Sequence, residues 1–426
     1  MSVKLSVVFA AAASPLHIER ARETASKAFS ALSQEGAELL GAPEPILEPE
    51  GLSEAISTRA DLRIIFVASG GTSRLLRRAL AGVEAILWAH PGDNSLPSAL
   101  SAREKLKAAG DWKAEIAFSS PKAVPYEIRA ELRAIKALKE FGGAEVLAIC
   151  DENVAAELDG ALSALGPWKP RLKRLDPRRL AGCLEAERGQ MSLGEAVSAL
   201  KGIEVEHATQ ELEEGIVRGV QLAELLQREA EETAGRAIIT FDCFRVMEEF
   251  GVTPCVAVGL LLERGITAVC EADPAALVLM AACHVLSGEP PWMANLARFD
   301  RASNTLTLAH CTACPSLAAS WPYRGVLLEH FETGKPAALD IWLRRGPIIL
   351  ANLQLGRRKL VLARGEVRDS GLGDERLCRT QALIKLKGDL EAFLAETSNH
   401  HVICYADIYE ELSRLGRRLG LEVVAL

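Results

Sequence analysis

A glutamate and a neighbouring aspartate stand where the sequence predicts the end of a buried strand. Glu271 follows the apolar segment 267–270 directly, and Asp273 comes just before Pro274, where a helix pattern begins. Ligands of α/β proteins bind outside the carboxyl ends of strands, so Glu271 is a candidate general base or metal ligand. The structural alternative is equally open: Asp273 caps the helix, and Glu271 is a solvated loop residue.

Three histidines also lie at predicted strand ends. His310 closes the strand pattern TLTLAH, whereas His400 and His401 open the pattern HHVICY after the turn 397–399. A histidine at a strand terminus is better placed to bind a metal or carry a proton than one in a core, although a lone histidine is more often structural. Because side chains alternate along a strand, only one of His400 and His401 can face a given site.

Two polar loops follow strand patterns in the first third of the chain. One reads Ser69-Gly70-Gly71-Thr72, and the other, at 90–95, contains Asn94. Backbone N–H groups in such a turn can cradle a phosphate or a hydroxylated ligand. The first loop lacks the Gly-Lys-Ser/Thr ending of a Walker motif, and a simple tight turn is the alternative interpretation.

The cysteines favour a reduced protein. One CxxC pair occurs, Cys311 and Cys314, and without a second pair it does not predict a zinc ribbon. A redox function of this pair is an alternative, and it predicts that Cys311→Ser abolishes function. The other cysteines are scattered singly and predict buried free thiols; they are Cys150, Cys183, Cys243, Cys255, Cys270, Cys283, Cys378 and Cys404.

The elements that must position these residues form two patterns. Short apolar strands alternate with amphipathic helices up to about residue 290, which predicts parallel βαβ units. Beyond it the segments are short and rich in turns, which predicts an antiparallel sheet or barrel. We therefore expect an α/β protein with two Rossmann-like domains, 1–142 and 143–290, followed by a β-rich domain, 291–426. Glu271 belongs to the second domain and His400 to the third.

Composition excludes some classes of partner. The chain of 426 residues has 57 acidic and 49 basic residues, a net charge of −8. No basic excess exists to neutralise phosphates, which argues against a nucleic-acid partner. The longest apolar runs fall short of a membrane span. We expect a soluble, cytoplasmic protein that does not bind membranes.

Three segments resemble the L-fucose isomerase family. The segment 270–300, CEADPAALVLMAACHVLSGEPPWMANLARFD, resembles the active-site region of L-fucose isomerases. The ending SNHHVICYADIYEELSRLGRRLGLEVV is similar to the C-terminal block of fucose and arabinose isomerases. The early segments SGGTSRLL and HPGDNSLPSALSAREKLKAAG resemble the N-terminal domain of fucose-isomerase-like proteins. The resemblance touches all three thirds of the chain.

This resemblance implies metal-dependent aldose–ketose isomerisation of a pentose or 6-deoxyhexose through a cis-enediolate. Glu271 matches the catalytic, metal-binding glutamate and His400 the metal-binding histidine, with manganese as the expected divalent cation. The family's second carboxylate, an aspartate, aligns with Asn295. An amide oxygen can still bind a cation, but it carries no charge and accepts no proton. A catalytically altered member that binds a sugar or metabolite without isomerising it is therefore the alternative.

The family also implies a homo-oligomer, a hexamer or trimer. In it Gly70, Gly71, Thr72 and Asn94 would contact the substrate of a neighbouring subunit. Ligands of one cation lie close together, so we expect the tips of Glu271, Asn295 and His400 within about 3–6 Å of one another. We expect His310 beside them, facing the substrate, and His401 on the opposite face. Asp300 and His310 are the nearby residues that could compensate for Asn295.

Overall fold

The computed structural model describes residues 4–201, 203–205, 209–233, 236–320 and 324–426. The chain divides into two compact units, residues 1–136 and 137–426. The division falls inside helix α5, as does the end of the predicted first domain at residue 142. The boundary predicted at residue 290 lies inside the second unit, between α12 and β12.

The first unit is a parallel sheet in the order β2-β1-β4-β5-β6, with β3 also pairing with β1. Side chains of its central strands, such as Phe9 of β1 and Phe66 of β4, are fully buried, because helices supply apolar side chains on both faces of the sheet. Its elements are β1 (Ser6–Ala12), α1 (Ile18–Ser33), β2 (Glu38–Leu40), β3 (Pro45–Ile46), α2 (Pro49–Ser57), β4 (Leu62–Val67), α3 (Ser73–Ala79), β5 (Ile86–Ala89), α4 (Ser95–Ala108), β6 (Glu115–Phe118) and α5 (Tyr126–Gly142).

The second unit begins with another parallel sheet, in the order β11-β10-β7-β8. Its strands and their helices are β7 (Glu145–Ile149), α6 (Glu152–Leu162), η1 (Ser163–Trp168), β8 (Arg171–Leu175), α7 (Pro177–Ala186), α8 (Leu193–Ala199), β9 (Glu204–Val205), α9 (Gln210–Glu231), β10 (Ala237–Phe241), α10 (Cys243–Phe250), α11 (Cys255–Glu263), β11 (Thr267–Val269) and α12 (Pro274–Ser287). Helix α12 is apolar nearly all round and fully buried along most of its length, because the sheet and the β-rich part both contact it.

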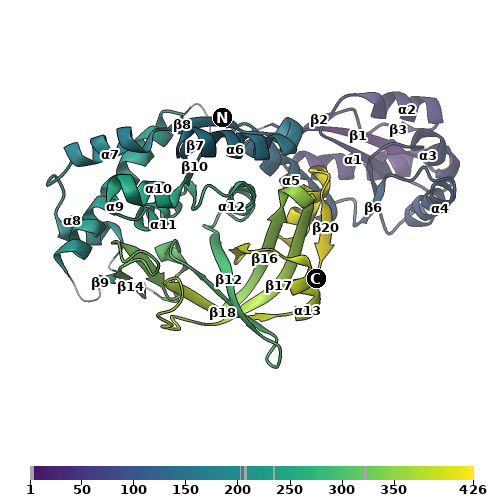
Figure 1. The fold of residues 1–426 in the computed structure, drawn as a ribbon. Coiled ribbons are helices and arrows are strands. Elements are labelled where there is room, and N and C mark those ends of the chain that lie inside the picture. Colours follow the sequence, from purple (N-terminus) through teal and green to yellow (C-terminus); the bar gives the residue numbers. More distant parts are fainter. Residues whose placement is uncertain (1–3, 202, 206–208, 234–235, 321–323) are drawn as a thin grey trace. The chain divides into compact units, whose positions relative to one another are not determined.

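The β-rich part closes into a six-stranded antiparallel barrel. The order β16-β19-β12-β13-β18-β17 is closed by pairing between β16 and β17, and β20 adds to β17 in parallel. Figure 1 shows these strands in green to yellow. The elements are β12 (Trp292–Asp300), β13 (Thr305–His310), η2 (Pro315–Leu317), β14 (Gly325–Leu328), β15 (Ala338–Ile341), β16 (Gly346–Gln354), η3 (Leu355–Arg357), β17 (Lys359–Ser370), β18 (Thr380–Leu386), α13 (Leu390–Glu396), β19 (His400–Cys404), α14 (Tyr409–Arg418) and β20 (Glu422–Ala425).

The expected fold class is confirmed: Rossmann-like parallel sheets precede an antiparallel barrel. A small sheet, β15-β14-β9, accompanies the barrel. Strand β12 is an addition that the apolar pattern does not predict, because only its first three residues are buried and its exposed end carries Arg298 and Asp300. In the part of the chain that the structure describes, no helix is long and apolar enough to cross a membrane.

Candidate active site

The site begins where two neighbouring parallel strands end. Strands β10 and β11 pair in register, so the residues that follow Phe241 and Val269 lie at the same sheet edge. Glu271 and Ala272 have positive φ angles of 62° and 47°. Such angles are costly for residues other than glycine, and they occur where the surroundings impose them. Here the backbone N–H of Ala272 donates to the carbonyl of Phe241, at 2.7 Å, and holds the turn against β10.

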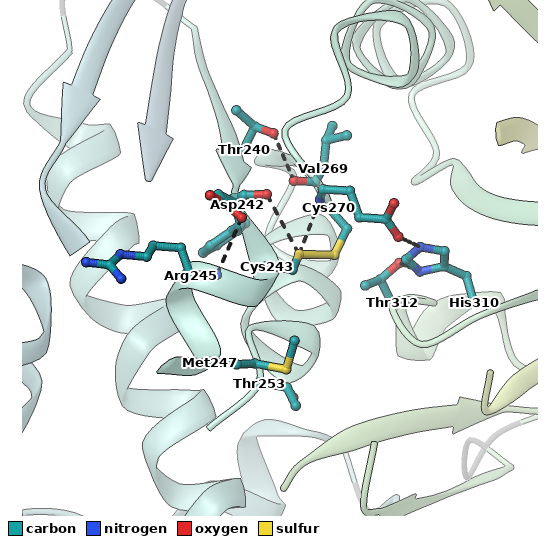
Figure 2. The surroundings of a disulfide bond; sticks show 12 residues. Thr240, Asp242, Cys243, Arg245, Met247, Thr253, Val269, Cys270, His310 and Thr312 are labelled. Atoms are coloured by element: carbon teal, nitrogen blue, oxygen red, sulfur yellow. Dashed lines mark hydrogen bonds and ion pairs between the residues drawn. A yellow bond between two sulfur atoms is a disulfide. The ribbon is translucent and has the colours of Figure 1, made fainter. Parts of the chain in front are cut away.

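A disulfide joins the same two strand ends. Cys243 follows β10 and Cys270 follows β11, and their sulfurs are bonded to each other (Figure 2). The expectation that both are free thiols is therefore wrong. Single spacing in the sequence hides this pair, because the parallel pairing of β10 with β11 is what brings the two cysteines together. The backbone N–H of Glu271 lies 3.2 Å from the Cys243 sulfur, so the bridge also contacts the glutamate.

Glu271 and His400 meet although they come from different parts of the second unit. Oε2 of Glu271 lies 3.3 Å from Nε2 of His400, the first residue of β19. The other ring nitrogen, Nδ1, is 2.6 Å from Oδ2 of Asp273. Asp273 also caps α12, since its Oδ1 accepts from the backbone N–H groups of Ala275 and Ala276. The cap and the histidine partner are thus one residue.

His310 contacts the other oxygen of the same carboxylate. Its Nε2 lies 3.3 Å from Oε1 of Glu271, and its Nδ1 lies 3.0 Å from the hydroxyl of Thr312. His310 is the last residue of β13 and is buried. Figure 2 shows His310 and Thr312 near the disulfide. A hydrogen-bonded and ion-paired chain therefore runs from Asp273 through His400, Glu271 and His310 to Thr312.

These contacts shift the pKa values of the residues that make them. Hydrogen bonds from His310 and His400 outweigh burial and hold the pKa of Glu271 well below its usual range. Burial alone would lower the pKa of His400, but the hydrogen bond to Asp273 and the charge of Glu271 raise it to about 9. The pKa of Asp273 is also lowered, because the bond to His400 and the capping N–H groups outweigh burial. Without a cation the site therefore favours carboxylates and an imidazolium, and a cation bound to His400 would have to displace the imidazolium proton.

Asn295 lies beside His400, on the neighbouring barrel strand. The two residues are directly paired in the β12–β19 ladder. The amide oxygen of Asn295 accepts a hydrogen bond from Nδ2 of Asn399, at 3.0 Å. Asp300, at the far end of β12, is exposed and accepts from the backbone N–H groups of Ala302 and Ser303 in the hairpin. It makes no hydrogen bond or ion pair to the other site residues that the structure describes, so it does not replace the missing carboxylate.

A pocket of about 40 Å³ lies beside these residues. Its described lining holds carboxylates, histidines and sulfur but no lysine or arginine. Phe244 at this pocket is exposed, whereas Cys255 and Cys311 are buried. The lining residues are Cys243, Phe244, Met247, Pro254, Cys255, Cys270, Glu271, Asn295, His310, Cys311, His330, Glu332 and Cys378.

The remaining predicted residues of the second unit are accounted for by packing. His401 is fully buried, with its ring nitrogens 2.6 Å from the Thr397 hydroxyl and 2.8 Å from the Asn399 carbonyl. Its ring also lies against Phe393 of α13. Cys311 and Cys314 are not bonded to each other. The Cys314 thiol instead donates to Glu263, at 2.7 Å.

The predicted loop residues of the first unit lie at the carboxyl ends of β4 and β5. The N–H of Gly70 donates to the carbonyl of Asp93, and that of Thr72 to the hydroxyl of Ser98. Asn94, with φ of 56°, starts α4. A Cβ on Gly70 would meet Cβ of Asn94 at 2.7 Å, so this glycine allows the two loops to touch. Two of the amides expected to cradle a ligand are thus already used within the unit.

The donor atoms suit a divalent cation in one respect. Nε2 of His400 is buried and faces Oε2 of Glu271, at 3.3 Å, while Asp273 anchors its Nδ1. A metal-binding histidine has this arrangement, with a carboxylate on one ring nitrogen and the other nitrogen turned toward a second ligand of the metal. Within the described ranges, however, no three His, Cys, Asp or Glu side chains are arranged to hold a metal ion. Glu271 and His400 would therefore bind a cation with help from neutral oxygens such as that of Asn295.

Two pocket residues, His330 and Glu332, are not predicted from the sequence to lie at a site. The strand pattern 325–330 ends at His330, whereas β14 itself ends at Leu328, and no motif or spacing marks either residue. Their arrival at the pocket depends on how the turn 329–336 packs against α10, which local patterns do not report. Phe244 is not predicted either, because a phenylalanine beside Cys243 carries no group that marks a site in the sequence.

No family model matches the chain. A sulfoquinovose isomerase of Priestia aryabhattai is 25% identical over 183 residues, which cover 41% of this chain and 40% of that protein. The sulfoquinovose isomerase of Priestia megaterium gives the same figures. That of Alkalicoccus urumqiensis is 26% identical over 190 residues, 42% of this chain and 41% of that protein. The chain thus spans about two fifths of the length of the curated relatives it matches.

Proposed function

We propose that this protein is a sugar isomerase that interconverts an aldose and a ketose. The observation that carries the proposal is the meeting of Glu271 with His400, whose other nitrogen is anchored by Asp273. Packing alone does not require two carboxylates and a half-buried histidine to converge beside a pocket. The partial similarity to sulfoquinovose isomerases supports the same class of enzyme.

In this proposal Glu271 is the general base. It takes the proton α to the substrate carbonyl and returns it to the neighbouring carbon. His310 contacts Oε1 of Glu271 and orients the carboxylate, while His400 and Asp273 fix the other oxygen. Glu271, His400 and the amide oxygen of Asn295 would hold a divalent cation, proposed to be manganese, which polarises the carbonyl and stabilises the enediolate. The closeness to L-fucose isomerases is part of this proposal.

The substrate we propose is a neutral sugar, a pentose or a 6-deoxyhexose. The charged side chains in the described lining of the pocket include Glu271 and Glu332, and none is a lysine or arginine. The described lining offers no lysine or arginine to pair with the acidic group of an anionic sugar, and the carboxylate of Glu332 repels such a group. Phe244, Met247 and Pro254 give one part of the lining an apolar character that suits a methyl group or a bare ring carbon.

One observation favours a second candidate, a protein that binds a sugar without isomerising it. Asn295 carries no charge, and its oxygen is engaged with Asn399. A member of this fold with weakened cation binding keeps its pocket but loses polarising power.

A substrate panel separates the two candidates. Neutral pentoses, 6-deoxyhexoses and sulfoquinovose are incubated with the protein and Mn²⁺, and aldose and ketose are quantified by NMR. We expect turnover of a neutral sugar, and none by Glu271→Gln, which keeps the size of the side chain. Arg345→Gln, at an exposed ion pair away from the pocket, is the matched control and should match the wild type. Saturable binding without turnover of any sugar would favour the binding protein, and turnover of sulfoquinovose alone would contradict the neutral-substrate proposal.

A further inference from the structure

The proposed reaction needs two groups that transfer protons, and Asn295 cannot be the second of them. Aldose–ketose isomerisation moves one proton between carbons and another between oxygens, and a second proton carrier beside the general base serves the oxygens. Glu271 is the first. The residue paired with His400, where a second carboxylate would stand, is Asn295, which accepts no proton. The inference below rests on the proposed isomerase function.

Most other titratable groups in the lining are already engaged. Both ring nitrogens of His310 have partners, Glu271 and Thr312. The contact with Cys255, together with burial, raises the pKa of the Cys311 thiol far above its usual range. The hydrogen bond to Cys311, together with burial, does the same for Cys378. These thiols stay protonated and are poor proton acceptors at neutral pH.

Two groups remain, His330 and Glu332, on the turn 329–336. The turn is closed by backbone bonds between His330 and Lys335 and between Gly334 and His330, at 2.8 and 2.9 Å. It is fixed to α10, because the Lys335 ammonium donates to the carbonyl of Met247, at 2.8 Å. Met247 itself lines the pocket, so the turn is held against the pocket wall.

His330 is the better placed of the two. Its side chain is half-buried, whereas that of Glu332 is exposed. Its Nδ1 lies 3.3 Å from the Thr333 hydroxyl, and its Nε2 makes no hydrogen bond to any residue that the structure describes. The titratable groups that act on it are His310, Arg379 and Glu271. Burial, with the first two, lowers the pKa of His330 despite Glu271, so the ring is neutral and can accept a proton at neutral pH.

We propose that His330 is the second proton-transferring group of this site. Glu271 takes the proton from carbon 2 of the aldose and returns it to carbon 1. His330 takes the proton of the carbon-2 hydroxyl and gives a proton to the oxygen on carbon 1. Each side chain ends as it began, and the sugar keeps its formula while the carbonyl moves from carbon 1 to carbon 2.

The test compares the wild type with His330→Asn, Glu332→Gln, Asn295→Asp and the double variant His330→Asn/Asn295→Asp, using the neutral sugar that the wild type turns over. We expect His330→Asn to lower kcat by roughly 10²–10⁴-fold with little change in KM. In D₂O it should still exchange the carbon-2 hydrogen through Glu271, so the ratio of exchange to isomerisation rises. The added carboxylate of the double variant should restore at least about tenfold of the lost kcat, because a carboxylate at 295 can move the same proton.

A second variant covers a failure of His330→Asn to fold. Thr333→Val, at an exposed residue, removes the contact to Nδ1 of His330 together with the contacts to the Met247 sulfur and the Lys335 N–H, and it should shift the acidic limb of the kcat profile. Full activity of His330→Asn, or loss in Glu332→Gln alone, would overturn the assignment while the isomerase function stands. An unshifted acidic limb in Thr333→Val would also count against it. A wild type that isomerises no sugar of the panel would remove both proposals together.

Discussion

Replacing Asp273 by asparagine separates two roles that the aspartate combines. Its Oδ1 caps α12 through Ala275 and Ala276, at 2.7 and 2.9 Å, and its Oδ2 bonds His400, at 2.6 Å. Asparagine keeps an oxygen for the cap and caps helices about as well as aspartate. It places an amide N–H₂ opposite Nδ1 of His400, which then has to accept instead of donate. The variant therefore removes the anchor of the histidine and keeps the start of the helix.

The size of the effect follows from the titration of His400. Its pKa is raised to about 9 in the folded protein, against about 6.5 in an unfolded chain, which corresponds to about 3 kcal/mol. A raised folded pKa gives stability that is fully present below about pH 6.5 and is lost as the pH rises to about 9. The hydrogen bond to Asp273 is the largest single cause that raises the pKa of His400, and Glu271, which the variant keeps, supplies the rest. The variant should therefore lose about 1–2 kcal/mol at about pH 6 and under about 1 kcal/mol at about pH 9.5.

The assay is urea-dependent hydrogen exchange of metal-free protein, read on peptides from α12 and β19 at both pH values. Asp151→Asn is the matched control, because Asp151 caps α6 through the same two positions and has no histidine partner among the described residues. We expect it to cost under about 1 kcal/mol at either pH. Equal losses at both pH values for Asp273→Asn would refute the ion-pair reasoning and leave only a capping role.

Three further outcomes follow. Asn295→Asp should tighten Mn²⁺ binding by about tenfold or more in calorimetry, because it adds a charged ligand beside His400, and unchanged affinity would place Asn295 outside the cation site. Burial lowers the pKa of His284 and His401 to about 4, so the unfolded chain binds protons that the folded chain excludes; stability should fall from about pH 6.5 toward pH 4, by about 2 kcal/mol for each histidine at about pH 5, and His401→Gln should blunt this fall in urea titrations. Light scattering should show a trimer or hexamer, and a monomer at micromolar concentration would contradict that expectation.

The fold was largely predictable because its signals are local. Apolar strands that alternate with helices predict parallel sheets, and the turn-rich last third predicts an antiparallel sheet or barrel. Strand β12 was missed because only its first part is buried, so no alternation marks the rest. The strand-end positions of Glu271, His310 and His400 were visible, but the pairing of Glu271 with His400 came from family resemblance, since nothing local connects the two.

Other parts of the site depend on tertiary contacts. Asp273 was recognisable as a cap, yet its second oxygen reaches His400 only because α12 packs beside β19. Cys243 and Cys270 each look like an isolated buried thiol, and the register of β10 and β11 brings them together. His330 reaches the pocket through a turn that Met247 anchors, and no residue type or spacing announces that anchor.

The division of the site between two layers has a consequence for how such proteins can be recombined. Glu271 and Asp273 come from the parallel-sheet part, whereas His310 and His400 come from barrel strands. A chimera that exchanged the barrel for that of a relative would exchange both histidines and keep both carboxylates. The two parts must therefore be exchanged together. A barrel exchanged alone would function only if its histidines contacted Glu271 and Asp273 in the same geometry.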